Sequence, residues 1–144
     1  MVSRVGVEAT TGGSCYHARM PVRYERDDAR RRVVVTVEGA LQTSEMLAAI
    51  GRQRAENTWN YGTLFDLRRV AGYPTVAELR DLMSQASAHP MAAGRPGPIA
   101  LLAIEATLYT RLCTYAALTQ GKLTLEVFRE ADEADRWLVT HASP

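Results

Sequence analysis

The chain has 144 residues, of which 47% are hydrophobic and 23% are charged, a composition typical of a globular domain. A chain of this length buries roughly 68–70% of the surface that its unfolded form exposes, so it can build a core without metals or disulfide bonds. Its 17 basic and 16 acidic residues give a net charge of +1, too weak a field to attract nucleic acid from a distance. We therefore expect one domain that does not bind nucleic acid.

The cysteines and the apolar runs indicate the compartment. Cys15 and Cys113 have neither the spacing of a disulfide framework nor that of a zinc site. Residues 1–20 contain no apolar stretch of the length, about 7–15 residues, that a signal peptide needs, and the chain has no apolar run of about 18 residues. We expect a cytoplasmic protein with no integral membrane segment, cofactor or metal.

The N-terminal segment differs from the rest of the chain. Residues 1–20 lack hydrophobic periodicity and include the loop-forming run Thr10-Thr11-Gly12-Gly13-Ser14. We expect this segment to be a poorly ordered tail. From Pro21 onward there is no linker or repeat, so residues 21–144 are expected to form a single domain.

The first half of that domain is expected to begin with a β-hairpin. The run 32–38 is rich in β-branched residues and closes at Gly39, and the turn-forming run Asp27-Asp28-Ala29-Arg30 precedes it. Helical spacing of Met46, Leu47 and Ile50 follows. The expected elements are strands at 22–25 and 32–38, a helix capped by Thr43 or Ser44 and running to about Asn57, and a buried strand at 62–67.

The second half continues this alternation of helices and strands. Thr75-Val76-Ala77-Glu78 is a capping box, in which the Thr75 hydroxyl accepts from the Glu78 backbone N–H and the Glu78 carboxylate reaches back. The continuously apolar run 99–104 is typical of a strand buried on both faces. The expected elements are a helix from Thr75 to about Pro90, a strand at 99–104, a helix from Thr107 to about Gly121 with Cys113 buried in it, a strand at 123–128, and a last helix that packs Ala134, Trp137 and Leu138.

The element order is therefore ββαβαβαβα. Strands that alternate with helices of 10–15 residues imply right-handed crossovers and a largely parallel sheet. We expect the first strand to be antiparallel. The predicted fold class is α/β, a mixed and mostly parallel five-stranded sheet packed with four helices.

Three segments resemble a known family. They are Trp59-Asn60-Tyr61-Gly62-Thr63-Leu64-Phe65-Asp66-Leu67-Arg68, the run Gly97-Pro98-Ile99-Ala100, and Val127-Phe128-Arg129 with Trp137-Leu138. With the element order, they make residues 21–139 similar to the SpoIIAA-like proteins of the STAS/SEC14-type superfamily. The resemblance implies an STAS-like fold, a bacterial cytoplasmic setting, and a function as a phospho-regulated protein switch or a carrier of lipophilic ligands.

Thr75 is the residue that this resemblance makes a possible phosphoacceptor. The regulatory branch places a phosphorylated Ser or Thr at a helix start after a strand that ends in Asp-Leu, usually within an Asp-Ser-Ser-Gly-like motif. Asp66-Leu67 and the helix start at Thr75 have this layout, but Pro74 and Val76 flank Thr75 and the motif is missing. A phosphate on Thr75 would lie near helix N–H groups, although the N-cap role alone explains this threonine.

The carboxyl ends of the strands are where open α/β sheets bind ligands. The residues expected at this edge are Asp66, Arg68, Tyr73, Thr75, Glu105 and Tyr109. Asp66 and Glu105 follow consecutive strands, so they are candidates for an acid/base pair, with Arg68 holding an anion. Carboxylates at strand ends also serve as caps and loop anchors.

Three functions remain open from the sequence. The first is a non-enzymatic STAS-like regulatory module that binds another protein or its own copy as a homodimer. The second is a carrier or sensor that binds a lipophilic small molecule in an apolar pocket. The third is a small hydrolase or isomerase that uses Asp66 and Glu105, which would require those carboxyls to converge with at least one raised pKa.

Overall fold

The computed structural model describes residues 22–40, 42–72, 74–87, 96–121 and 123–142. The expected tail at 1–20, and Tyr73, lie outside these ranges. The elements in chain order are β1 (Val22–Asp27), β2 (Arg32–Ala40), α1 (Thr43–Ala55), β3 (Gly62–Gly72), α2 (Val76–Ser87), β4 (Ile99–Leu102), α3 (Ala106–Leu118), β5 (Leu125–Phe128) and α4 (Ala131–Thr140). The predicted order ββαβαβαβα is confirmed.

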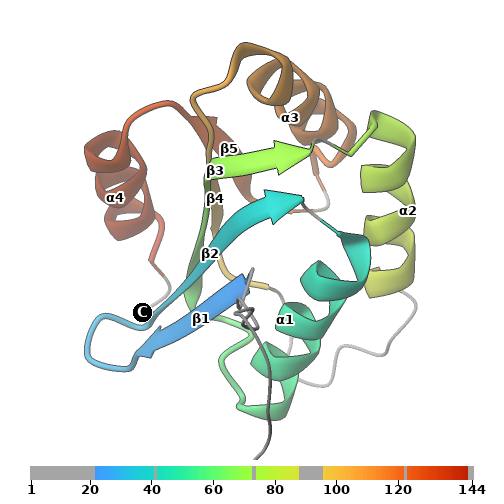
Figure 1. Cartoon of the computed structure of the whole chain (residues 1–144). Coiled ribbons are helices and arrows are strands. Elements are labelled where there is room, and N and C mark those ends of the chain that lie inside the picture. Colours follow the sequence, from blue (N-terminus) through green and yellow to red (C-terminus); the bar gives the residue numbers. More distant parts are fainter. Residues whose placement is uncertain (1–21, 41, 73, 88–95, 122, 143–144) are drawn as a thin grey trace, which may run out of the picture.

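The five strands form one sheet in the order β1-β2-β3-β4-β5. β1 pairs with β2 in antiparallel orientation, and every other pair is parallel. β3, β4 and β5 are each added at the same edge of the sheet. Right-handed crossovers therefore place α1, α2 and α3 on one face. The last helix, α4, has no strand after it and covers the opposite face (Figure 1).

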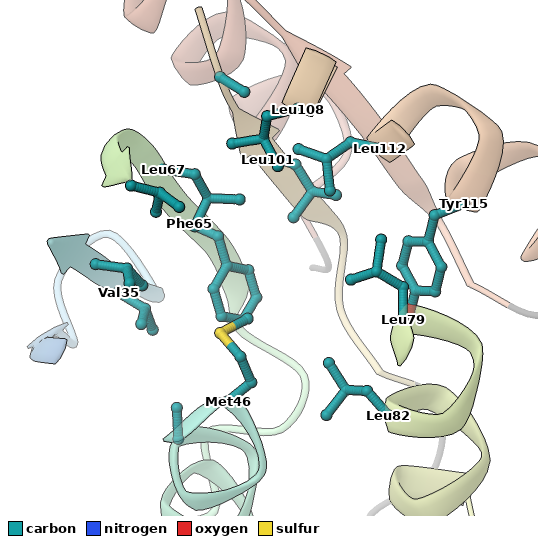
Figure 2. Close-up of a cluster of buried hydrophobic side chains, with 14 of the residues drawn as sticks. Val35, Met46, Phe65, Leu67, Leu79, Leu82, Leu101, Leu108, Leu112 and Tyr115 are labelled. Carbon is teal, nitrogen blue, oxygen red and sulfur yellow. The ribbon is translucent and has the colours of Figure 1, made fainter. Parts of the chain in front are cut away.

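The main core lies between the sheet and helices α1 to α3. Alternate residues of β2 and β3 point into it, as the two-residue period of a strand requires: Val33, Val35 and Val37 are fully buried, and Phe65 and Leu67 lie beside them. Helix α1 contributes Met46, α2 contributes Leu79 and Leu82, and α3 contributes Leu108, Leu112 and Tyr115 (Figure 2).

A smaller core lies under α4. Ala134 and Leu138 pack on Ala100, and the Trp137 ring lies 5.6 Å from that of Phe128. The same helix carries Asp135, which forms ion pairs with Arg30 and with the buried Arg32 of β2. The Arg32–Asp135 ion pair thus joins α4 to the start of β2.

Several local predictions were wrong. Helix α1 begins at Thr43 after Gln42, with no side-chain cap bond, so neither Thr43 nor Ser44 is its N-cap. β3 continues to Gly72 because β2 pairs with it as far as Ala40. The end of β3 depends on its partner strand, and the N-cap of α1 depends on where the backbone enters the helix. The local sequence pattern specifies neither.

Two further corrections concern β4 and α3. β4 ends at Leu102, and Ile104 is 56% exposed although it closes the apolar run. Cys113 is exposed, because it lies one residue beyond the buried Leu112 and so points about 100° away from the core face. Among the described helices, none is long and apolar enough to cross a membrane.

Candidate functional site

The candidate site predicted from the sequence is a set of six residues, of which Tyr73 lies outside the described residues. The other five, here called the carboxyl edge, are Asp66, Arg68, Thr75, Glu105 and Tyr109. Asp66 pairs with Leu102, the last residue of β4, and Glu105 follows three residues later. Both carboxylates therefore lie toward the same end of neighbouring parallel strands, as expected.

Asp66 and Arg68 form a local ion pair. Arg68 donates from Nε to Oδ1 at 3.0 Å and from Nη2 to Oδ2 at 2.9 Å, and its backbone N–H donates to Oδ1 at 3.2 Å. These bonds lower the pKa of Asp66 below its usual range and raise that of Arg68. Asp66 therefore stays ionised near neutral pH, which is the wrong state for a general acid, and its partner guanidinium is already occupied.

Thr75 and Glu78 form the predicted capping box. The Glu78 backbone N–H donates to Thr75 Oγ1 at 3.1 Å, and the Thr75 backbone N–H donates to Glu78 Oε1 at 2.8 Å. Arg111 of α3 donates to the Pro74 carbonyl at 3.4 Å, so α3 contacts the residue just before the cap. Hydrogen bonds to Glu78 of the same helix and from Arg111 of α3 therefore hold the start of α2 in place.

Replacing the Thr75 cap tests this local role. Thr75→Ala is expected to lower the free energy of unfolding by about 0.5–2 kcal/mol, because the Glu78 N–H loses its acceptor. Thr75→Ser keeps a hydroxyl at the same place and should unfold at close to the wild-type urea concentration. Equal destabilisation of both variants in urea titrations would show that the hydroxyl bond is not what matters.

Glu105 has the capping role that was the alternative to acid/base chemistry at this edge. It is the N-cap of α3, and its Oε1 accepts from the Leu108 backbone N–H at 2.9 Å. The expected helix start at Thr107 is wrong by one residue, and the spacing Glu105-x-x-Leu108 carried no signal because Glu is an uncommon cap. With Asp66 bound to Arg68 and Glu105 capping α3, the described geometry gives no support to an acid/base pair.

The half-buried Tyr109 belongs to the carboxyl edge, and the exposed Ile104 directly precedes Glu105 in the chain. The Arg129 guanidinium lies 4.3 Å from the centroid of the Tyr109 ring, and the neighbouring Cys113 raises the pKa of Tyr109. Ile104 was predicted to be a buried strand residue, yet it presents an apolar side chain to solvent beside Glu105.

A second candidate site is an apolar cavity beside the main core, of the kind that the carrier hypothesis requires. Its volume is about 450 Å³, within the range of about 300–1,000 Å³ found for small-molecule pockets. α1, α2 and α3 contribute to its wall, and β3, β4 and β5 to its floor. In Figure 2 the side chains of Met46 and Phe65 face those of Leu79 and Leu82 across it. The cavity depends on how far helices stand from the sheet, which periodicity does not predict.

Comparisons with known proteins bear on the fold. No family model matches the chain, and no curated protein matches it. A solved structure described as an anti-sigma factor antagonist from Mycobacterium paratuberculosis matches with a TM-score of 0.55 and 19% sequence identity, covering 81% of this chain and 92% of that one. The chain has the STAS-like fold.

This STAS-like fold agrees with the resemblance drawn from the sequence. The mixed five-stranded sheet and its four helices are those expected of a SpoIIAA-like protein. At 19% identity the likeness concerns the backbone arrangement, so the roles of individual residues must come from this chain's own geometry.

Proposed function

We propose that this protein is a non-enzymatic regulatory module that binds another protein through the carboxyl edge of its sheet. The observation that carries the proposal is the fold it shares with an anti-sigma factor antagonist. The site geometry supports it, because the two candidate catalytic carboxylates serve as an ion-pair partner and a helix cap.

The surface around Ile104 has the chemistry of a protein interface. Ile104 is exposed, and Arg68 and Arg69 are exposed on the neighbouring strand, each beside a carboxylate, Asp66 or Glu38. An apolar centre with a polar rim is the usual anatomy of such contacts, and arginine is enriched in them.

Substituting Ile104 tests this interface. Ile104→Asp should abolish capture of a specific partner from a lysate of the source organism while changing the free energy of unfolding by less than about 0.5 kcal/mol, because the side chain is exposed. Val139→Asp is the matched control, since Val139 is 60% exposed on α4. The captured proteins are compared by quantitative mass spectrometry. If both variants retain the same proteins as wild type, the proposal is contradicted.

We propose that phosphorylation of Thr75 regulates binding at the carboxyl edge. Thr75 is exposed and opens α2, and a phosphate there would add about two negative charges beside the Glu78 carboxylate. Such a modification would disturb the capping box and thereby alter binding at the edge. Fragmentation mass spectrometry of the protein purified from its source tests this, and unmodified Thr75 under every growth condition would contradict it.

The cavity favours a second candidate function, a carrier or sensor of a lipophilic small molecule. Its lining is mainly apolar, with Phe65, Leu101 and Leu112 among the residues that surround it. Native mass spectrometry of gently purified protein should show a retained lipophilic molecule that leaves on denaturation. A clean apo mass after every mild preparation would count against this candidate.

A further inference from the structure

One end of the apolar cavity is polar. Gln53 and Arg54 of α1, together with Trp59 of the following turn, line the cavity near the start of β3. The Arg54 guanidinium lies 4.7 Å from the centroid of the Trp59 ring, so the two side chains form one stacked unit. The remainder of the lining comes mainly from apolar side chains of the main core.

The Trp59 indole makes this end chemically distinctive. Its Nε1 atom is buried, yet the N–H donates to no acceptor among the described residues. A buried donor without a partner is destabilising, and most such groups in proteins are satisfied by protein, water or ligand. The nearby Gln53 side chain donates its amide nitrogen to Thr63 Oγ1 at 2.8 Å, and its amide oxygen makes no hydrogen bond to the indole N–H.

Charge selects among the possible acceptors. Arg54 places a positive charge against the same ring, and a hydrogen bond to an ionised acceptor is stronger than one to a neutral acceptor. A nucleotide or another polyanion suits the cavity poorly, because apolar side chains surround most of its volume. A molecule with one carboxylate and an apolar body satisfies both ends.

We propose that this cavity binds an amphipathic monocarboxylate of the medium-chain fatty acid class. The carboxylate accepts a hydrogen bond from Trp59 Nε1 and lies beside Arg54, while the chain extends between α1, α2 and the sheet. This inference rests on the second candidate function and adds to it the class of ligand and the residues that recognise its head.

Calorimetric titration with decanoate and with 1-decanol, both below their aggregation concentrations, tests the proposal on the full chain. Wild type should bind decanoate at least about tenfold more tightly than 1-decanol. Arg54→Met and Trp59→Phe, which keep most of the apolar surface, should each weaken decanoate binding by about tenfold and leave 1-decanol binding unchanged. Arg52→Met is the matched control on the same helix, because Arg52 stacks on Tyr24 and pairs with Glu56 instead, and it should bind decanoate as wild type does.

The outcomes separate the two levels of the proposal. If neither compound binds to folded wild-type protein, the cavity is not a ligand site and the carrier candidate fails with the inference. If both compounds bind equally well, the cavity is a site but the recognition of a carboxylate is wrong. If decanoate is preferred but Arg54→Met and Trp59→Phe, shown to be folded by circular dichroism, bind it as wild type does, the carboxylate lies elsewhere and the inference is overturned.

Discussion

Gly97→Ala is expected to destabilise the protein by about 2–3 kcal/mol, the upper part of the range for overpacking a tight site. A Cβ at this position would lie 2.3 Å from the Tyr61 carbonyl oxygen and 2.5 Å from that of Asn60. Those atoms belong to the backbone, and the Gly97 N–H donates to the Trp59 carbonyl at 3.1 Å, so neither segment can move without losing this bond. Urea unfolding followed by circular dichroism measures the effect.

Gly51→Ala is the matched control for this substitution. Gly51 lies inside α1, and an added Cβ would meet nothing within 4 Å. Alanine there should stabilise the protein by about 0.5–1 kcal/mol, because glycine loses more backbone freedom in a helix. A Gly97→Ala variant as stable as wild type would show that the segment at Asn60 and Tyr61 can move aside from Gly97.

Asp135→Ala is the second substitution with a large expected effect. It removes the carboxylate that pairs with Arg32, whose side chain is only 7% exposed. Breaking a buried pair costs about 3–5 kcal/mol because one charge is left in the interior. Asp135 itself is 45% exposed, so water screens part of the loss and we expect about 1–3 kcal/mol. Asp81→Ala, at an exposed position of α2, should change the free energy of unfolding by less than about 0.5 kcal/mol.

The destabilisation by Asp135→Ala should depend on pH. Arg32, with a smaller contribution from Arg30, lowers the pKa of Asp135 in the folded protein. A carboxylate with a lowered folded pKa stabilises above its unfolded pKa of about 3.9, and this contribution is lost as the pH falls through the folded value. The difference in unfolding free energy between wild type and Asp135→Ala should therefore be largest near pH 7 and shrink below about pH 4. A difference that stays constant between pH 7 and pH 3 would contradict the ion-pair explanation.

Periodicity and local capping determined much of this protein from the sequence alone. The β-branched run at 32–38 predicted a strand, and the helical spacing of Leu79 and Leu82 predicted the buried face of α2, because burial of one face imposes the period of a helix. The Thr75–Glu78 capping box was also readable, since its bonds join residues three apart.

Tertiary structure decided the features that depend on residues far apart in the chain. The Arg32–Asp135 pair joins residues about a hundred positions apart, and the Arg54–Trp59 stack matters only because helices α1 to α3 leave a cavity beside it. The local sequence predicted Ile104 as a buried strand residue and left Glu105 open between acid/base chemistry and capping. In the structure β4 ends early and Glu105 caps α3. Local pattern specifies which face of an element is apolar, whereas cavities, long-range ion pairs and exposed edges arise from how those faces pack.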